Sequence, residues 1–352
     1  MEYSSIEKRK QEHIELCLNK NIQTKNTSLY EDIVLLHRAI PNIDKNKIDL
    51  TVDFLGKKIN YPFVIEAMTG GCKLANTINK NLAIAAQVLN IPVCVGSQRA
   101  MLEDKKQTNS FELKKFAPKI PFLISNIGLV QFCQNQYKTE DINKITNSIN
   151  ADALCIHLNA AQEALQKNGD VNFENGFEIL KKIANNSFVP IIVKETGCGI
   201  IKEDAYKLAK LSNNISMIDI AGNCGTSFTH IEALRRKDNF GLIFKKWGIP
   251  TTISTIECSS CGIPLIASGG VRDGIQCAKL LRLGSDYLGF ALPLLKPSLQ
   301  SPDAVIEKIK KIAEELKITM FLCGAKNIKD FKKTPVVILG KTKNWINNRV
   351  KN

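Results

Sequence analysis

The 352-residue chain lacks any apolar run close to the ~20 residues that a membrane-spanning helix needs. Its first residues, Met1 to Ser5, lack the basic and then apolar pattern of a secretory signal peptide. We therefore expect a cytoplasmic protein with no membrane partner. The 11 cysteines are odd in number and scattered, so we expect reduced thiols that pack as small apolar residues.

Patterns typical of zinc and nucleic-acid binding are also missing. Cys258-Ser259-Ser260-Cys261 is the one Cys-x-x-Cys stretch, and neither a second pair nor a nearby histidine completes a zinc site. The net charge is +14, but the lysines are dispersed, and no aromatic-interleaved basic motif or helix-turn-helix pattern appears. A basic surface of this kind raises the local concentration of small anions. We therefore expect a small anionic ligand and no nucleic acid.

From Phe63 onward, apolar runs alternate with helical patterns. This alternation predicts a parallel sheet with crossover helices, and eight such units predict closure into a (β/α)8 barrel, known as a TIM barrel. An open, doubly wound sheet would have fewer strands and one glycine-rich turn. The expected strands are Phe63–Ala67, Pro92–Val95, Phe122–Ile124, Asp152–Ile156, Pro190–Val193, Ile215–Ile220, Pro264–Ala267 and Asp286–Gly289.

The alternation of strands and helices divides the chain into three expected regions. Residues 1–60 form an N-terminal extension, residues 61–300 the barrel, and residues 301–352 a C-terminal helical tail that packs on the barrel. In the extension, Arg9, Lys10 and His13 lie on a charged helical stretch. A solvated, salt-bridged helix explains this spacing, and an anion clamp is the functional alternative.

Polar residues follow nearly every expected strand, as they do at the active face of such a barrel. His157, Asn159, Gln162 and Glu163 follow the fourth strand, although an asparagine helix cap explains this cluster when it is taken alone. Thr69, Ser97, Asn126 and Thr226 add donors at other strand ends.

Two further features of the strand ends predict an anionic ligand. Gly269 and Gly270, followed by Arg272, predict a phosphate site after the seventh strand. Lys194 ends the fifth strand and needs an anion, either in a Schiff-base role or as the partner of an electron-rich ring. A flavin mononucleotide or a sugar phosphate fits this array.

With these residues in view, the chain resembles the type 2, flavin-dependent isopentenyl-diphosphate isomerases over nearly its whole length. Two departures concern Ala160-Ala161, where Pro-Leu is expected, and Asn223-Cys224-Gly225-Thr226, where Gly-Gly-Thr is expected. The stretches that carry the resemblance are Arg9-Lys10-x-x-His13-Ile14, Met68-Thr69-Gly70-Gly71, Gly96-Ser97-Gln98-Arg99, His157-Leu158-Asn159-x-x-Gln162-Glu163, Val193-Lys194-Glu195-x-Gly197-Cys198-Gly199, Trp247-Gly248-Ile249-Pro250-Thr251 and Ser268-Gly269-Gly270-Val271-Arg272-Asp273-Gly274.

The resemblance implies conversion of isopentenyl diphosphate to dimethylallyl diphosphate with reduced FMN, Mg²⁺ and NADPH as reductant, by a homo-oligomer (a tetramer or an octamer). Gln162, Glu232 and His13 would be catalytic, and Glu163 would hold Mg²⁺. Substrate binding would fall to Arg9, Lys10, Ser97, Gln98, Arg99, His157, Asn159 and Gln162. FMN binding would fall to Ala67, Met68, Thr69, Ser97, Asn126, Lys194, Thr226, Gly269, Gly270, Arg272, Ala291 and Leu292.

Two other functions stay open at this point. Another FMN-dependent TIM-barrel oxidoreductase, of the 2-hydroxy-acid or IMP-dehydrogenase kind, would share the phosphate loop and Lys194. It would not need the N-terminal clamp or the Gln162–Glu163 pair. A basic binding protein without catalysis would take up no flavin.

Overall fold

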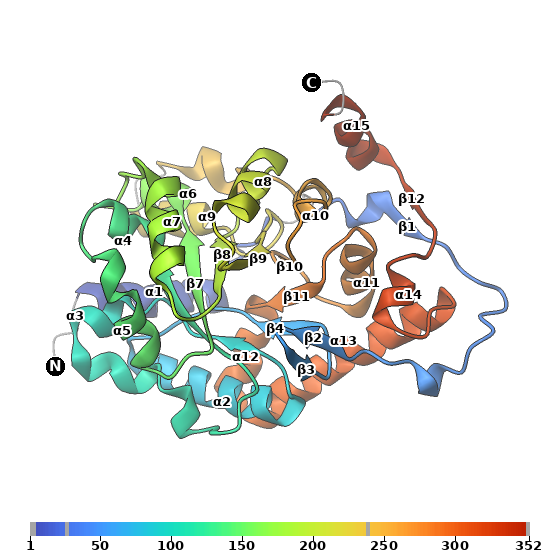
Figure 1. Cartoon of the computed structure of the whole chain (residues 1–352), viewed down its shortest axis with the longest axis horizontal. Helices are drawn as coiled ribbons and strands as arrows, with labels where there is room; N and C mark the ends of the chain where they lie inside the picture. Colours follow the sequence, from blue (N-terminus) through green and yellow to red (C-terminus); the bar gives the residue numbers. More distant parts are fainter. Residues whose placement is uncertain (1–4, 25–27, 237–239, 350–352) are drawn as a thin grey trace.

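The computed structural model describes residues 5–24, 28–236 and 240–349. Eight parallel strands close a barrel in the order β10-β11-β4-β5-β6-β7-β8-β9 (Figure 1). The predicted TIM barrel is therefore confirmed, since each strand overlaps one expected run. The strands are β4 (Phe63–Ile65), β5 (Val93–Cys94), β6 (Leu123–Gly128), β7 (Ala153–Leu158), β8 (Ile191–Glu195), β9 (Ile215–Asp219), β10 (Leu265–Ala267) and β11 (Tyr287–Phe290).

Helices between the strands cover the outside of the barrel (Figure 1). Several connections also contain short 3-10 turns. The helices are α2 (Lys73–Leu89), α3 (Arg99–Glu103), α4 (Leu129–Cys133), α5 (Ile142–Asn147), α6 (Ala160–Leu165), α7 (Gly176–Asn186), α8 (Lys202–Leu211), α9 (Phe228–Arg236), α10 (Thr251–Cys258), α11 (Gly274–Arg282) and α12 (Leu292–Gln300). The 3-10 turns are η1 (Tyr30–Asp32), η2 (Lys45–Lys47), η3 (Lys105–Ser110), η4 (Leu113–Lys115), η5 (Thr139–Asp141) and η6 (Leu242–Lys246).

A hairpin closes the amino-terminal end of the barrel. It consists of β2 (Val52–Phe54) and β3 (Lys57–Ile59). Phe54 is fully buried and packs edge to face on Phe122 and Tyr287, which stand at the amino ends of β6 and β11. With this end filled by apolar side chains, only the carboxyl ends of the strands are left to form a polar cavity.

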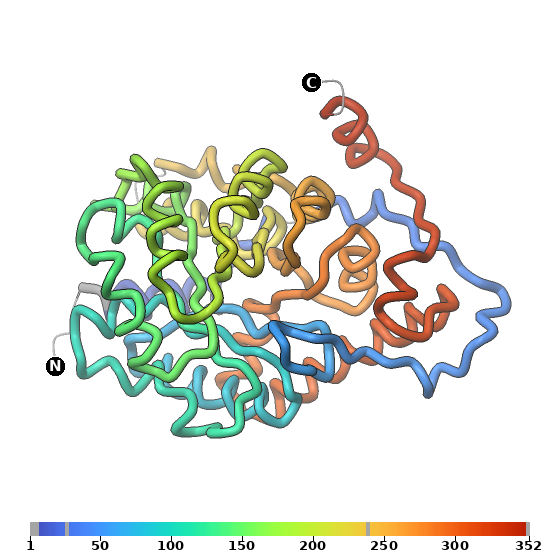
Figure 2. Tube along the Cα trace, viewed as in Figure 1, coloured from blue at the N-terminus to red at the C-terminus, as the bar shows by residue number. Residues whose placement is uncertain are grey.

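A segment of the N-terminal extension pairs with the C-terminal part of the chain beside the barrel. Strand β1 (Ile33–Leu35) pairs with β12 (Val336–Ile338) in an antiparallel ladder. Figure 2 shows the segment after β1 (blue) running beside the C-terminal part (red), where the Arg38 amide donates to the Leu322 carbonyl at 2.8 Å. This part of the chain contains α13 (Pro302–Leu322), α14 (Ile328–Phe331) and α15 (Gly340–Arg349).

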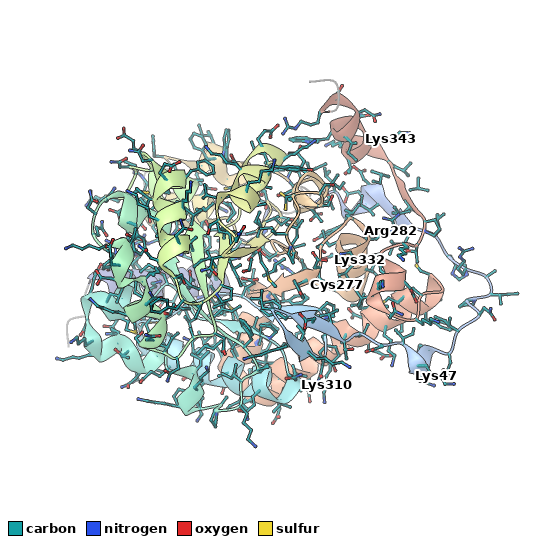
Figure 3. The ribbon with its side chains drawn as sticks, viewed as in Figure 1. Lys47, Cys277, Arg282, Lys310, Lys332 and Lys343 are labelled. Atoms are coloured by element: carbon teal, nitrogen blue, oxygen red, sulfur yellow. The ribbon has the colours of Figure 1, made fainter. Side chains whose placement is uncertain are left out.

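The C-terminal part is held to the barrel by packing and by polar contacts. Helix α13 packs against α2, α11 and α12. Lys332 pairs with Asp286 at 2.6 Å, and Arg282 of α11 donates to the Thr334 carbonyl; Lys332 and Arg282 are labelled in Figure 3. Over the described ranges, no helix combines the length and apolar character needed to cross a membrane.

Candidate functional site

A large cavity opens at the carboxyl ends of the barrel strands, and α1 (Ser5–Asn19) covers it from one side. It contains about 1610 Å³ of atom-free space, including its opening to solvent. Its lining residues come from α1 and from the carboxyl ends of all eight barrel strands.

Buried charges form the floor of the cavity. The Lys194 ammonium lies between Asp219, to which it donates a hydrogen bond, and Glu66, at 3.1 Å. Burial opposes the charge of Lys194, but Asp219 and Glu66 outweigh this effect and raise the pKa of Lys194 above its ordinary value. Ser268 donates to Asp219 at 2.6 Å. The anion that Lys194 requires is therefore supplied by the protein's own carboxylates.

His157 stands next to Lys194 in the parallel register of β7 and β8. Its Nδ1 lies 2.9 Å from Asn126 Oδ1, and the Asn126 amide nitrogen donates to the Val95 carbonyl at 3.0 Å. Because this bond orients the amide, His157 Nδ1 is the donor and its Nε2 is free to accept. Burial, followed by the charges of Lys10 and Lys194, lowers the pKa of His157 to about 3, so the ring is neutral.

Loops after β9 and β10 form a glycine-lined cradle. Gly269 and Gly270 both have positive φ, at 92° and 89°. A Cβ on Gly225 would lie 2.7 Å from the Gly270 nitrogen, so the two loops can touch only where both are glycine. Arg272 also lines the cavity and donates to Gln23 Oε1 at 2.9 Å. Exposed amides beside a guanidinium are suited to a phosphate.

The N-terminal helix brings its own polar group to the cavity. His13 Nε2 lies 2.9 Å from Glu232 Oε1, and Gln162 donates to the same oxygen at 3.4 Å. Arg235 holds the other oxygen of Glu232 at 2.6 Å. Burial opposes ionisation of Glu232, but His13 and Arg235 outweigh it and lower the pKa of this carboxyl. An ionised carboxylate thus links α1, α6 and α9.

Arg9, Lys10 and Arg99 concentrate positive charge on the same side of the cavity. Burial, and then the charge of Arg9, lower the pKa of Lys10 to about 8. Arg99 is bound to Glu103 at 2.8 Å and to Asp170 at 2.7 Å, which fixes the direction of its guanidinium. Of the two interpretations of the N-terminal helix, the lining of the cavity favours the anion clamp.

Glu163 is buried within a set of donors. Its Oε1 accepts from the Asn159 amide at 2.8 Å, and its Oε2 accepts from the Asp170 backbone nitrogen at 2.8 Å and from Gln166 at 3.1 Å. Asn159 Oδ1 is buried and has no hydrogen-bond partner among the described residues. The described ranges contain no group of three or more His, Cys, Asp or Glu side chains placed to hold a metal. A carboxylate beside a free amide oxygen suits Mg²⁺, which takes few protein ligands and completes its shell with water and phosphate oxygens.

The structure brings most of the predicted site residues to this cavity but corrects one prediction. The Gln98 side chain does not line it: the residue is fully buried, donates to the Ile145 carbonyl at 3.1 Å and accepts from Ser125. Its amide therefore packs inside the fold and does not meet a substrate. Glu232 lies behind the lining, in contact with His13 and Gln162. The predicted residues that line the cavity are Arg9, Lys10, His13, Ala67, Met68, Thr69, Ser97, Arg99, Asn126, His157, Asn159, Gln162, Glu163, Lys194, Thr226, Gly269, Gly270, Arg272, Ala291 and Leu292.

Sequence reasoning missed several polar residues of the site, among them Glu66, Asp219 and Gln131. Glu66 and Asp219 are single acids inside apolar strands, at 4% and 1% exposure. A lone acid in an apolar run could have indicated these two residues, because a buried lysine such as Lys194 needs a counter-charge. Gln131 also lines the cavity, but it lies in a helix, and nothing in its local sequence distinguishes it.

Comparison with known proteins agrees with this geometry. Residues 5–246 match the family of FMN-dependent dehydrogenases. The isopentenyl-diphosphate delta-isomerase of Pyrococcus furiosus is 43% identical, over 97% of this chain and 89% of its own length. The protein of the same name from Methanosarcina barkeri is 38% identical, over 98% and 96%. The chain belongs to the isopentenyl-diphosphate delta-isomerase family.

Solved structures place this isomerase among FMN enzymes by fold. A flavocytochrome b2 variant with sulfite bound superposes with a TM-score of 0.66 at 18% identity, covering 96% of this chain and 87% of its own. A mandelate oxidase variant with an FMN adduct gives 0.65 at 15%, covering 90% and 93%. At these identities the likeness concerns the barrel alone.

The residues of the isomerase cavity fit the FMN that its family uses. The glycine cradle with Arg272 can take the phosphate. Thr69 Oγ1 is a buried polar atom with no hydrogen-bond partner in the described part of the chain, and it lines the cavity. A polar planar ring would satisfy this hydroxyl, since buried polar atoms are nearly always paired.

Proposed function

We propose that the enzyme converts isopentenyl diphosphate to dimethylallyl diphosphate by a 1,3 proton shift, with reduced FMN and Mg²⁺, in isoprenoid biosynthesis. One observation carries the proposal. A single cavity joins a phosphate cradle and charged floor suited to FMN with a separate cluster of cations, Arg9, Lys10 and Arg99, suited to a second, strongly anionic ligand.

The cation cluster and its neighbours support binding of a diphosphate. Arg9 and Arg99 offer planar forks for phosphate oxygens, and Lys10 adds a compact charge. His157 and Asn159 line the same cavity. Glu163, with the free Oδ1 of Asn159, would hold Mg²⁺, which neutralises diphosphate charge.

Proton transfer is the difficult step, because an unactivated alkene gives a tertiary cation when protonated. No ordinary carboxylic acid or imidazolium is strong enough to drive this unaided near neutral pH. Reduced FMN, when bound, supplies an electron-rich ring that can carry a proton at N5 and stabilise a neighbouring cation.

The chain supplies a route for the departing proton. Gln162 lines the cavity and contacts the ionised Glu232, which His13 and Arg235 hold in place. We assign Gln162 to contact with the allylic carbon and Glu232 to proton acceptance through it. The contact between His13 and Glu232 also joins α1 to the site, so α1 excludes water from the reacting atoms.

The test is anaerobic NMR of isopentenyl diphosphate with the enzyme, FMN, NADPH and Mg²⁺. We expect dimethylallyl diphosphate to accumulate over many turnovers, with NADPH consumed only to reduce the flavin, since the reaction has no net redox change. NADPH loss equal to substrate loss, without dimethylallyl diphosphate, would instead show an FMN-dependent oxidoreductase, the alternative that the dehydrogenase family match favours.

We also propose a homo-oligomer, a tetramer or an octamer. The β1–β12 ladder and its flanks expose apolar side chains to solvent, and such patches mark protein contacts. Light scattering after size exclusion measures the assembly directly, and a monomer would contradict the proposal. The exposed side chains are Val34, Leu36, Ile40, Val337 and Leu339.

A further inference from the structure

Glu66 is the least satisfied charged group on the cavity floor. It follows β4, is 4% exposed, and has its Oε2 at 3.1 Å from Lys194. Its Oε1 is buried without a hydrogen-bond partner among the described residues. A Cβ on Gly289 would lie 2.3 Å from this oxygen, so the glycine leaves room for it at the cavity wall. One carboxyl oxygen of Glu66 therefore lacks a donor among the described residues.

Asp219, on the other side of Lys194, is well satisfied. It accepts from Lys194, from Ser268 at 2.6 Å and from the Ala221 amide at 3.2 Å. Two ionised carboxylates against one ammonium would bury one uncompensated negative charge, which is costly. The less satisfied acid should take up the proton: burial, and then the charge of Asp219, raise the pKa of Glu66 to about 8.

We propose that protonation of Glu66 is coupled to the redox state of the bound flavin, so that Glu66 keeps its proton whenever the ring is reduced and anionic. The inference rests on FMN binding in this cavity and is independent of the isomerisation. Lys194 cannot balance the reduced ring alone, because Asp219 already neutralises it. With a proton on Glu66, the floor has no net charge and the anionic ring meets no repulsion.

Reduction of the ring and protonation of Glu66 together take up a fixed number of electrons and protons. A two-electron reductant or an electrode supplies the electrons, and the ring takes up both electrons and one proton. Above the pKa of Glu66, one further proton passes from water to the Glu66 carboxylate. The other titratable groups that face this network come from β5, β7, β8 and β9, and they are Cys94, Cys155, His157, Lys194 and Asp219.

Spectroelectrochemistry of the FMN-loaded full-length protein tests the coupling. The midpoint potential is followed from about pH 6 to about pH 9.5 in the wild type and in Glu66→Gln. Above about pH 8, we expect the wild-type potential to fall about twice as steeply with pH as that of the variant, because reduction takes up one extra proton. Below about pH 7, the two slopes should agree.

Glu257→Gln is the matched control, because Glu257 pairs with Arg349 at 2.9 Å and does not line the cavity. The midpoint potential of Glu257→Gln should change with pH as that of the wild type does over the whole range. Equal slopes for wild type and Glu66→Gln at high pH would overturn the proposal. Failure of both proteins to bind FMN would contradict the proposed function instead.

A second measurement needs no flavin and therefore tests Glu66 even if the protein does not bind FMN. Carboxyl ¹³C NMR of the ligand-free protein should show a glutamate that titrates near pH 8 and that is missing in Glu66→Gln, whereas the signal of Glu195, whose pKa burial raises to about 7, should be present in both proteins. A Glu66 carboxyl that titrates near its usual ~4.3 would overturn the proposal independently of any cofactor.

Discussion

Replacing Lys194 by methionine should destabilise the fold far more than the loss of one surface charge does. The substitution removes the ammonium but leaves Asp219 and Glu66 buried at 1% and 4% exposure. Methionine fills most of the space of the lysine stem, so the effect reports charge more than volume. Breaking a buried ion pair on one side typically costs about 3–5 kcal/mol, because the remaining charge stays without a partner.

The pH dependence separates this cause from a packing defect. Without Lys194, the buried pair of carboxyls loses its counter-charge, so the folded variant should retain protons to higher pH than the folded wild type does. A raised carboxyl pKa contributes stability that is present below the unfolded value, ~4, and that is lost as the pH rises. The variant should therefore approach the wild type at low pH and diverge from it towards pH 8, by at most about 1.4 kcal/mol per pH unit for each proton retained on folding.

Urea unfolding, followed by tryptophan fluorescence at about pH 5 and about pH 8, measures both predictions. Lys144→Met is the control, because Lys144 pairs with Asp141 at 2.7 Å on the surface with 83% of its side chain exposed. Water screens that exposed pair, so its loss should change the free energy of unfolding little. A loss in Lys194→Met that matched the control, or that did not change with pH, would refute the assignment of a buried charge network.

Three other substitutions test the ligand sites. Gln162→Ala should lower isomerisation by about 10²–10⁴-fold with an unchanged flavin absorption spectrum, since the residue acts in proton transfer; normal turnover would exclude that role. Arg272→Ala should weaken FMN binding by about 1.5–3 kcal/mol but leave riboflavin affinity unchanged, because riboflavin lacks the phosphate; equal losses for both ligands, measured by fluorescence quenching, would contradict the cradle. In the wild type, substrate affinity should fall above about pH 8, because Lys10 loses its proton there. In Lys10→Arg the fall should be smaller. Titration calorimetry at pH 7 and pH 9 compares the affinities of the two proteins.

The barrel could be predicted from the sequence because its signals are local. Each strand is an apolar run with polar residues after it, and parallel strands bring those residues to one edge. The residues on the carboxyl ends of β7 and β10, such as His157 and Gly270, therefore reached the cavity as expected. Strand ends were less accurate: β6 continues to Gly128, beyond the expected Ile124.

Other features depend on contacts that the local sequence does not show. Gln98 stands between two lining residues, Ser97 and Arg99, but a helix begins at Arg99 and the Gln98 side chain turns into the core. The partners of Lys194 are Glu66, which follows β4, and Asp219, which ends β9. Their contacts with Lys194 form only when the barrel closes. The position of α1 over the cavity likewise depends on the bond between His13 and Glu232.

The strand order explains why the charged floor lies where it does. The phosphate cradle follows the neighbouring strands β9 and β10, and the predicted diphosphate residues follow β5 and β7. In the closed order, β4 and β8 stand on opposite sides of the barrel between these two arcs. Glu66 follows β4 and Lys194 ends β8, so their 3.1 Å contact crosses the barrel. A flavin that extended from the cradle towards the diphosphate residues would pass over this contact, so its ring would meet the charges of Glu66 and Lys194. The charge of Glu66 and Lys194 is therefore the part of the protein best placed to control the charge of that ring.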